Sequence, residues 1–293
     1  MSTRWIIKIY IVLLSISFII PGIFIFKILT ATGPLMSVSF LDVGQGDAIY
    51  IELPDRTSIL IDGGVDNSVV YELGAVMPWW KHHIDFVIVT HPDLDHYGGL
   101  HAVAEKYSIG SLLHNGHASD EPYFQLLLST VEDRGTAIRA IEQGLTLVGE
   151  SGVELQVVWP RRSYDAEDKN SLSIATLLSW HDVDFLLTGD LGQAEEHEIV
   201  ADYPLLSAEV LKLGHHGSKY SSSFAFLTTV SPRYCIVSAG AGNSYGHPHK
   251  DVLDRAHDID CELSDTAHEG TITFHTDGYD IAREVAKPLY MRL

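Results

Sequence analysis

A stretch of ten residues, from Thr90 to Gly99, packs two histidines and two aspartates into six positions directly after an apolar run. The apolar run, Phe86 to Val89, has the composition of a buried strand. Pro92 disfavours a helical conformation at the residue before it, so the polar side chains should leave a loop at the end of that strand. Two imidazoles and two carboxylates that converge on one point suit zinc or manganese better than calcium, which prefers shells of oxygen alone. The segment His91-Pro92-Asp93-Leu94-Asp95-His96 therefore predicts a metal site, and the alternative is a polar turn whose side chains are merely solvated.

Strand and helix patterns alternate through the rest of the chain and predict one domain over residues 34–293. Runs typical of strands occupy residues 36–43, 48–53, 58–61, 153–159, 171–179, 183–188, 208–213 and 233–238. Helical patterns cover residues 69–80, 100–106, 193–203, 222–229 and 249–257. Strand-rich halves with interspersed helices are typical of the α+β class, in which helices cover the outer faces of sheets.

An apolar run of 18 residues, Ile9 to Phe26, precedes this domain and has basic residues on both sides. The run is long enough to span a bilayer, and the basic residues favour a cytoplasmic N-terminus. We therefore expect residues 1–33 to be a signal-anchor or transmembrane helix with a short hinge, which attaches the domain to the membrane in an extracytoplasmic position. If residues 1–31 are cleaved as a signal, the protein is secreted; a buried core helix is the third interpretation.

The composition, 46% hydrophobic and 20% charged, provides enough apolar material for a large core and excludes disorder as the main state. The formal charge of −20 should repel nucleic acid and anionic lipid except where bound metal or local basic residues intervene. A long, salt-resistant DNA footprint is therefore not expected. The two cysteines, Cys235 and Cys261, are equally compatible with a disulfide in an oxidising compartment and with buried free thiols.

Further polar residues stand at the ends of other strand-like runs, where a sheet would bring them to one point. Asp62 follows one run and Asp190 another, and a buried carboxylate there needs a cation or several backbone donors. An Asp-Gly turn and a helix cap are the respective alternatives. His215 and His216 end a third run, and because adjacent side chains on an extended backbone point in opposite directions, only one of them should touch a given metal. The loop that carries His247 offers a proton donor or a phosphate contact, or is an ordinary polar turn.

The order and spacing of these motifs resemble the metallo-β-lactamase superfamily, in a variant where Asp93 replaces the middle His of a His-x-His-x-Asp-His motif. More narrowly, three elements resemble the C-terminal hydrolase domain of ComEC-type competence proteins and their secreted relatives: Phe40 to Ala48, Asn170 with Ser173, and Asn243 to Pro248. The likeness covers nearly all of residues 37–275. It implies an αββα sandwich with the site on one edge, formed by loops from both sheets.

The resemblance also implies a centre of two divalent metal ions, zinc or manganese. The implied ligands are His91 and Asp93 for the first ion, Asp95 and His96 for the second, Asp190 as a bridge, and His215 rather than His216 as the second ion's further imidazole. Where richer sites of the superfamily have another His, this chain offers only Asn170 or Ser173 as weak ligands, so the first ion should be loosely held. Asp62 would not bind an ion but would hold the ligand loop in place.

With that ligand set, the resemblance implies a hydrolase whose metal-activated water attacks a phosphoryl or carbonyl group. Asp95 would also orient the water, and His247 or His216 would stabilise the oxyanion or protonate the leaving group. Lys212 and Lys219 flank the loop of paired histidines. We expect both to be solvated surface lysines, with contact to an anionic substrate as the alternative.

The favoured function is a phosphodiesterase or DNase that acts on a phosphodiester or another small anionic substrate, with single-stranded DNA as one candidate. One alternative is a hydrolase of a cell-surface phosphoester, a lactone or a β-lactam, and another is a membrane-tethered metal-binding module without catalysis. The absence of the middle His argues against β-lactam chemistry. An open, Asp-rich site argues against structural zinc, which favours closed shells of Cys and His.

Overall fold

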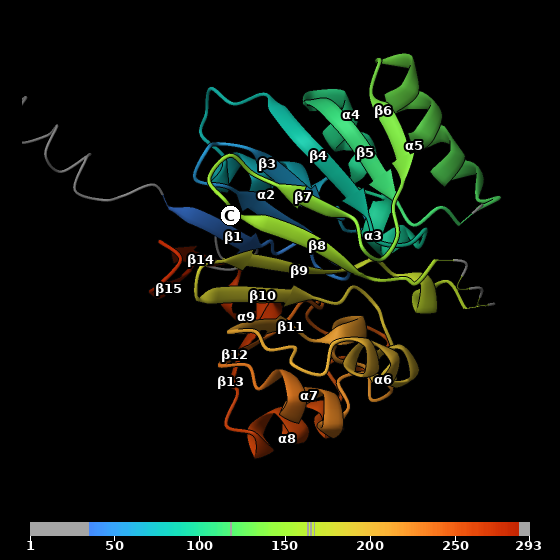
Figure 1. Cartoon of the computed structure of the whole chain (residues 1–293). Helices are drawn as coiled ribbons and strands as arrows, with labels where there is room; N and C mark the ends of the chain where they lie inside the picture. Colours follow the sequence, from blue (N-terminus) through green and yellow to red (C-terminus); the bar gives the residue numbers. More distant parts are fainter. Residues whose placement is uncertain (1–34, 118, 163, 165, 167, 287–293) are drawn as a thin grey trace, which may run out of the picture. The chain divides into compact units, whose positions relative to one another are not determined.

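Two β-sheets pack face to face in the computed structural model, which describes residues 35–117, 119–162, 164, 166 and 168–286. Helices cover the outer side of each sheet (Figure 1), so the α+β sandwich expected from the sequence is confirmed. All of these strands and helices lie in the compact unit that begins at Met36.

The first sheet has, within the described residues, eight strands in the order β15-β14-β1-β2-β3-β4-β5-β6. Their bounds are β1 Met36–Phe40, β2 Ile49–Glu52, β3 Ser58–Ile61, β4 His83–Val89, β5 Ser108–His114, β6 Ala137–Ala140, β14 Ile272–Thr276 and β15 Ile281–Val285. The helices that follow its strands are α2 Ser68–Val76, α3 Leu94–Tyr97, α4 Leu100–Lys106 and α5 Pro122–Asp133. Strands β3 to β6 run parallel, so their carboxyl ends share one edge of the sheet.

The second sheet has, in the described part of the chain, seven strands in the order β13-β12-β11-β10-β9-β8-β7. Their bounds are β7 Thr146–Val148, β8 Glu154–Trp159, β9 Ala175–Trp180, β10 Val183–Leu187, β11 Val210–Lys212, β12 Tyr234–Val237 and β13 Glu262–Asp265. The associated helices are α6 Gln193–Asp202, α7 Phe224–Val230, α8 Lys250–Asp258 and α9 Thr266–Glu269, with short 3₁₀ turns η1 Asn170–Leu172 and η2 Gly214–Gly217. Strands β10 to β13 run parallel, so this sheet also gathers its carboxyl ends at one edge.

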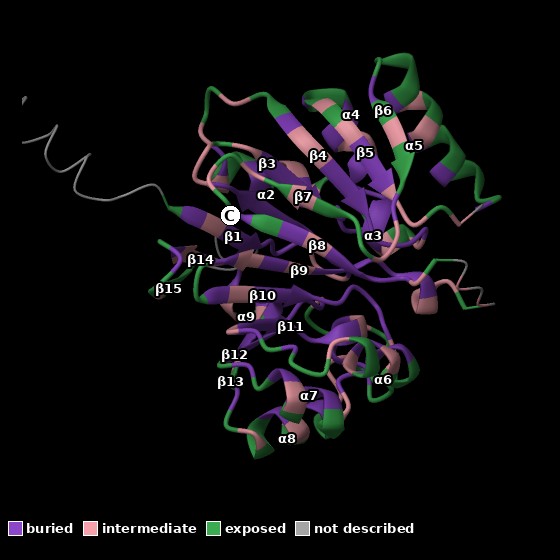
Figure 2. Cartoon of the chain, viewed as in Figure 1, coloured by how far each residue is buried: buried purple, intermediate pink, exposed green. Residues whose placement is uncertain are grey.

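Buried apolar residues form three clusters, one between the sheets and one under the helices of each sheet. Figure 2 shows the buried residues along the strands of both sheets. In the layer between the sheets, the ring of Phe274 contacts Phe40 and Phe185, with centroids 6.1 and 6.0 Å apart. Strands such as β3 and β12 are buried at every position because they carry a core on both faces. Their sequences therefore contain short unbroken apolar runs, and the polar residues that end such runs emerge at the sheet edge.

Two kinds of element differ from the sequence expectation. The strand expected at residues 171–179 starts only at Ala175, because the chain first makes the η1 turn and directs Ser173 inward to His91 and Asp190. Strands β5, β6, β7, β13, β14 and β15 and helix α5 were not predicted. In β6, β7 and β15 every side chain is exposed or only half-buried, so these strands lack the apolar pattern that marks a strand in a sequence.

Cys235 in β12 forms a disulfide with Cys261, which stands just before the neighbouring strand β13, and their Cα atoms are 5.9 Å apart. The sequence left the state of these cysteines open. The bond links two adjacent parallel strands of the second sheet.

The expected transmembrane or signal segment over residues 1–33 lies outside the described residues. Among the residues that are described, no helix combines the length and the apolar character needed to cross a bilayer. The expectation of a membrane-anchored, extracytoplasmic domain is therefore corrected, since the described structure contains no helix that would provide the anchor.

Candidate metal centre

Loops at the carboxyl ends of strands from both sheets supply one buried cluster of polar side chains. The residues are Asp62 after β3, His91 after β4, Asp190 after β10, and His215 and His216 after β11. The loops that carry Asp47 and Asp95 approach each other closely. The N–H of Asp47 donates a hydrogen bond to the carbonyl oxygen of Asp95 at 3.2 Å. Gly46 makes this approach possible, because a Cβ at that position would lie 1.9 Å from the same carbonyl oxygen.

Asp62 is fully buried and lies behind His96. Its carboxylate accepts hydrogen bonds from the N–H and the hydroxyl of Thr90, at 2.8 and 2.7 Å. Its Oδ2 lies 2.8 Å from Nδ1 of His96, so this nitrogen carries a proton and Nε2 faces the opposite way. The position behind a candidate ligand is the one proposed for Asp62 from the sequence.

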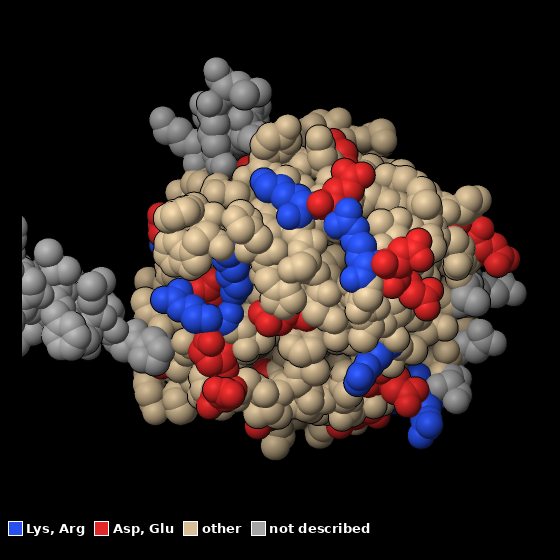
Figure 3. All heavy atoms as spheres, turned by 90° about the horizontal axis from the view of Figure 1, so that it is seen from above, with Lys and Arg blue, Asp and Glu red and all other residues tan. Residues whose placement is uncertain are grey.

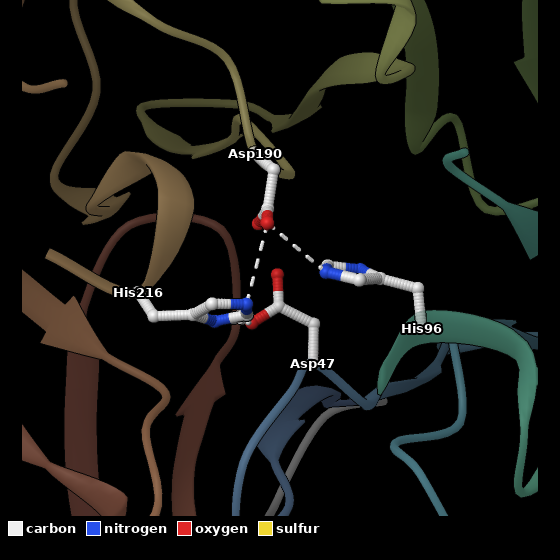
Figure 4. Close-up of side chains that lie close together, drawn as sticks. All are labelled: Asp47, His96, Asp190 and His216. Carbon is white, nitrogen blue, oxygen red and sulfur yellow. Dashed lines mark ion pairs between the residues drawn. The ribbon is translucent and has the colours of Figure 1, made fainter. Parts of the chain in front are cut away.

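Asp190 stands at the middle of the cluster, between His96 and His216 (Figure 4). Its Oδ2 lies 3.3 Å from Nε2 of each of these two histidines. His216 is held from behind by the carbonyl oxygen of Ser238, which lies 2.9 Å from Nδ1. Both imidazoles therefore direct the same nitrogen, Nε2, at one carboxylate oxygen.

His91 approaches the same oxygen from another side, with its Nε2 4.0 Å from Oδ2 of Asp190 and 3.6 Å from Oδ2 of Asp93. Its Nδ1 lies 3.0 Å from the hydroxyl of Thr90 and 3.2 Å from that of Ser173. Ser173 also accepts a hydrogen bond from the N–H of Asp190 at 3.2 Å. The structure thus places Ser173 where it orients His91 and Asp190.

Asp93 and Asp95 line the open side of the cluster, with side chains 37% and 29% exposed. Oδ2 of Asp95 lies 3.4 Å from Nε2 of His216. Solvent and a substrate can therefore reach the cluster from the side of these two carboxylates, whereas the histidines close it from within.

Five buried polar atoms in and beside the cluster have no hydrogen-bond partner in the described structure: Nε2 of His91, His96 and His216, and Oδ1 of Asp47 and Asp190. Burial of such atoms without a partner is costly, and native proteins usually satisfy them. Imidazole nitrogens and carboxylate oxygens are ligands for zinc and manganese. The donor set therefore fits a divalent cation.

The paired histidines adopt an unexpected backbone, with φ values of 46° for His215 and 54° for His216. These left-handed conformations cost roughly 1–2 kcal/mol per residue, and the extended backbone assumed from the sequence is wrong. As a result both rings face the cluster, and Nε2 of His215 lies 3.7 Å from Oδ2 of Asp190. His215 is nevertheless 33% exposed, and Asn170 lies 3.5 Å from its ring nitrogens, so Asn170 is placed beside the cluster.

Asp47 was not identified from the sequence, although it lies with His96, Asp190 and His216 in one compact group of potential ligands. Its Oδ2 is 2.5 Å from Nζ of Lys212, which is fully buried. The expectation of a solvated Lys212 is therefore wrong. A signal was present, since Lys212 interrupts the apolar run Val210 to Leu213, where a charged residue has to find a buried partner.

In the cluster, the carboxylates and the imidazoles stabilise each other's charged forms. Burial works against a charged Asp190, but His216 and His96 outweigh it and hold the pKa of this carboxyl well below its usual range. Burial likewise works against charged imidazoles, yet Asp190 and Asp62 raise the pKa of His96 well above its usual value. Asp190 and Asp47 do the same for His216. The carboxylates around the histidines therefore stabilise a positive charge at this point.

His247 lies at the mouth of the cluster, with its ring centroid 5.5 Å from that of His215 and 6.3 Å from that of His216. Asn243 shapes the loop, since its Oδ1 accepts a hydrogen bond from the N–H of His247 at 3.0 Å. Burial and the neighbouring histidines lower the pKa of His247 to about 4. The ring is therefore neutral at neutral pH.

Glu196 on α6 holds the loop that follows the paired histidines, and it should make stability depend on pH. Its buried carboxylate accepts hydrogen bonds from the N–H groups of Ser222 and Ser223. Burial raises the pKa of Glu196 from 4.5 to about 7, so the folded state keeps a proton there that the unfolded state has lost. The free energy of unfolding should therefore fall as the pH rises through this window.

We predict that Glu196→Gln weakens this fall by about 2–3 kcal/mol between pH 5 and pH 8, because Gln does not titrate. Urea unfolding at the two pH values measures the effect. Glu198→Gln, on the exposed side of the same helix, is the matched control and should leave the fall unchanged. Equal pH dependence in Glu196→Gln and the unmodified chain would show that Glu196 titrates normally.

Comparison with known proteins supports the fold. The family model of the metallo-beta-lactamase superfamily matches residues 41–240. ComE operon protein 3 of Bacillus subtilis is 30% identical over 274 residues, and competence protein ComA of Neisseria gonorrhoeae is 28% identical over 242 residues. These matches cover 86% and 81% of this chain but only 34% and 32% of the relatives, so the chain spans about a third of their length.

Two solved structures share the fold at low sequence identity. The metal-dependent hydrolase Tm1679 of the beta-lactamase superfamily has a TM-score of 0.54 at 12% identity, over 78% of this chain and 95% of its own. Zn²⁺-bound PqqB from Methylobacterium extorquens has a TM-score of 0.53 at 10% identity, over 80% of this chain and 99% of its own. The chain belongs to the metallo-beta-lactamase superfamily, with competence proteins among its relatives.

Proposed function

We propose that this chain is a metal-dependent phosphodiesterase with a centre of two divalent ions. The observation that carries the proposal is the convergence of three buried imidazoles on one carboxylate oxygen. The Nε2 atoms of His91, His96 and His216 lie 4.0, 3.3 and 3.3 Å from Oδ2 of Asp190, and all three lack a hydrogen-bond partner in the described structure. A bridging carboxylate with imidazoles on different sides is suited to two cations rather than one.

The distances suggest how the ligands divide between the two ions. Asp93 lies beside His91, so the proposed first set is His91, Asp93 and Asp190. Asp95 lies beside His216, so the proposed second set is Asp95, His96, His216 and Asp190. We assign His216 rather than His215 to the second set because it is buried and its Nδ1 is anchored to Ser238. When bound, the ions would lower the pKa of a water toward neutrality and offset the charge that builds on a phosphoryl group.

We assign His247 to the oxyanion rather than to the leaving group. A ring with a pKa of about 4 holds a single proton at neutral pH, so it can donate one hydrogen bond but has no proton to deliver. Its position beside His215, at the open side of the cluster, suits contact with a charged oxygen of the substrate. His216 is a poor proton donor for the leaving group, because both of its ring nitrogens face groups of the centre.

The proposed substrate is a phosphodiester, with single-stranded DNA as the polymer that the competence-protein relatives suggest. A cavity of about 780 Å³ lies next to η1 and is lined by Asn115, Gln143, Arg161, Tyr164 and Leu172 among others, but by none of the candidate ligands. On the face shown in Figure 3, Lys and Arg side chains lie among Asp and Glu. With a formal net charge of −20, the chain suits a short contact with a phosphodiester better than a long DNA footprint.

Turnover of a generic phosphodiester tests the proposal. We expect the purified chain to hydrolyse bis-p-nitrophenyl phosphate with Mn²⁺ or Zn²⁺ and to stop when a chelator is added, because the negative cluster needs cations to approach an anionic substrate. Release of p-nitrophenol measures the rate, and re-addition of the metal is the control. No turnover with any divalent metal would contradict the proposed enzyme. Cleavage of single-stranded DNA only at very low salt would argue against DNA as the natural substrate.

A further inference from the structure

A buried ion pair between Lys212 and Asp47 lies directly behind the cluster. Nζ of Lys212 is 2.5 Å from Oδ2 of Asp47, and the two side chains are 0% and 2% exposed. The same ammonium donates a hydrogen bond to the carbonyl oxygen of Gly189 at 2.9 Å and lies 3.8 Å from Oδ1 of Asp190. Lys212 thus contacts the turn that carries the central carboxylate, on the side away from the histidines.

Asp47 makes the corresponding contact with a different candidate ligand. Its Oδ1 lies 3.3 Å from Nδ1 of His216, the nitrogen opposite the one that faces Asp190. The close-up in Figure 4 shows Asp47 reaching toward this ring from the first sheet. Oδ2 pairs with Lys212, whereas Oδ1 has no hydrogen-bond partner among the described residues. Asp47 therefore acts on the ring of His216 through its charge, beside the hydrogen bond between Nδ1 and Ser238.

The pair also joins the two halves of the sandwich. Asp47 stands on the loop between β1 and β2 of the first sheet, whereas Lys212 ends β11 of the second. A buried ion pair contributes little net stability compared with well-packed apolar residues, because two charges have to be desolvated. Stability alone therefore gives no reason for this pair, while its contacts with Asp190 and His216 do.

We propose that Lys212 and Asp47 are positioning residues, which fix Asp190 and His216 from behind so that both present their free atoms to the metal ions. Lys212 holds the Gly189-Asp190 turn and attracts Oδ1, which leaves Oδ2 directed at the histidines. Asp47 fixes the ring of His216. This inference rests on the proposed metal centre.

The double variant Asp47→Asn/Lys212→Met separates positioning from folding. Each single change leaves an unpaired buried charge and should lower the melting temperature of the metal-free chain, whereas the double change removes both charges and should recover it. The affinity for Mn²⁺, measured by calorimetry, should nevertheless stay about 10- to 100-fold below that of the unmodified chain, because Asp190 has lost its contact with Lys212 and His216 has lost the carboxylate charge beside its ring. A double variant with unchanged Mn²⁺ affinity would overturn the inference.

Two further variants keep the test decisive. Ser58→Ala removes a buried hydroxyl that bonds Asp85 at the start of β3, the opposite end of that strand from Asp62, so it should lower the melting temperature without changing Mn²⁺ affinity. If the double variant does not recover its melting temperature, Lys212→Gln, which keeps donors but no charge, is measured below its own transition. Its Mn²⁺ affinity should be at least about 10-fold lower, and unchanged affinity would overturn the inference. Failure of the unmodified chain to bind Mn²⁺ would instead contradict the proposed function, and the positioning role with it.

Discussion

Replacing Asp190 by Ala should abolish metal binding and hydrolysis together. Oδ2 of Asp190 lies 3.3 Å from Nε2 of His96 and 3.3 Å from Nε2 of His216, and it also faces His91, so its removal takes a ligand from both proposed ions. We expect turnover of a phosphodiester to fall by at least about a thousandfold, since each ion supplies several kcal/mol to the transition state. Metal analysis of the purified variant should show that the ions are lost at the same time.

The Asp190→Ala experiment needs two further variants. One keeps the shape of the side chain, and the other removes an unrelated carboxylate. Asp190→Asn preserves the volume but not the charge, and it should lose most of its metal. Asp254→Ala, which removes an exposed carboxylate from α8, should keep full activity and metal content. Full metal content in Asp190→Ala would show that Asp190 does not bridge the ions.

Replacing His216 by Ala should remove the second ion, whereas replacing His215 should not. His216 is buried, with Nδ1 anchored to Ser238 and Nε2 directed at both Asp190 and Asp95. His215 is more exposed and lies farther from Asp190, at 3.7 Å. We expect metal content to fall from two ions to one in His216→Ala, with turnover lower by on the order of a thousandfold.

The His215→Ala variant is the matched control, because it deletes the same ring at the neighbouring position. It should retain both ions and lose activity only to the extent that His215 shapes the mouth near His247. The reverse result, with metal lost from His215→Ala and retained in His216→Ala, would restore the assignment made from the sequence.

Much of the fold could be predicted because buried strands leave a clear pattern. Strand β3 and strand β12 carry a core on both faces, and their unbroken apolar runs were recognised. The edge strands β6 and β15 are mostly exposed, so nothing in their composition separates them from loops. A helix boundary also differs by a few residues. The helix α2 ends at Val76, although the apolar pattern continues to Trp80.

The candidate site was predictable to the extent that each ligand stands in a motif of its own. Asp62, Asp190 and the segment from His91 to His96 all follow apolar runs, so their positions at a sheet edge could be inferred. The choice between His215 and His216 could not, since it depends on two consecutive left-handed residues that an extended backbone does not suggest. Asp47 lies in the Phe40 to Ala48 motif but received no role, because nothing in that loop indicates that its partner is Lys212.

The residue pattern alone was enough to indicate the family and a metal site, because closely spaced His and Asp residues at strand ends carry that information locally. Which atoms face one another became clear from the folded chain. Folding brought His91, His96 and His216 around Asp190, and it buried Lys212 against Asp47 from the other sheet. Contacts between residues far apart in the chain depend on how the two sheets pack. A local pattern of residues does not indicate which distant residues such packing brings together.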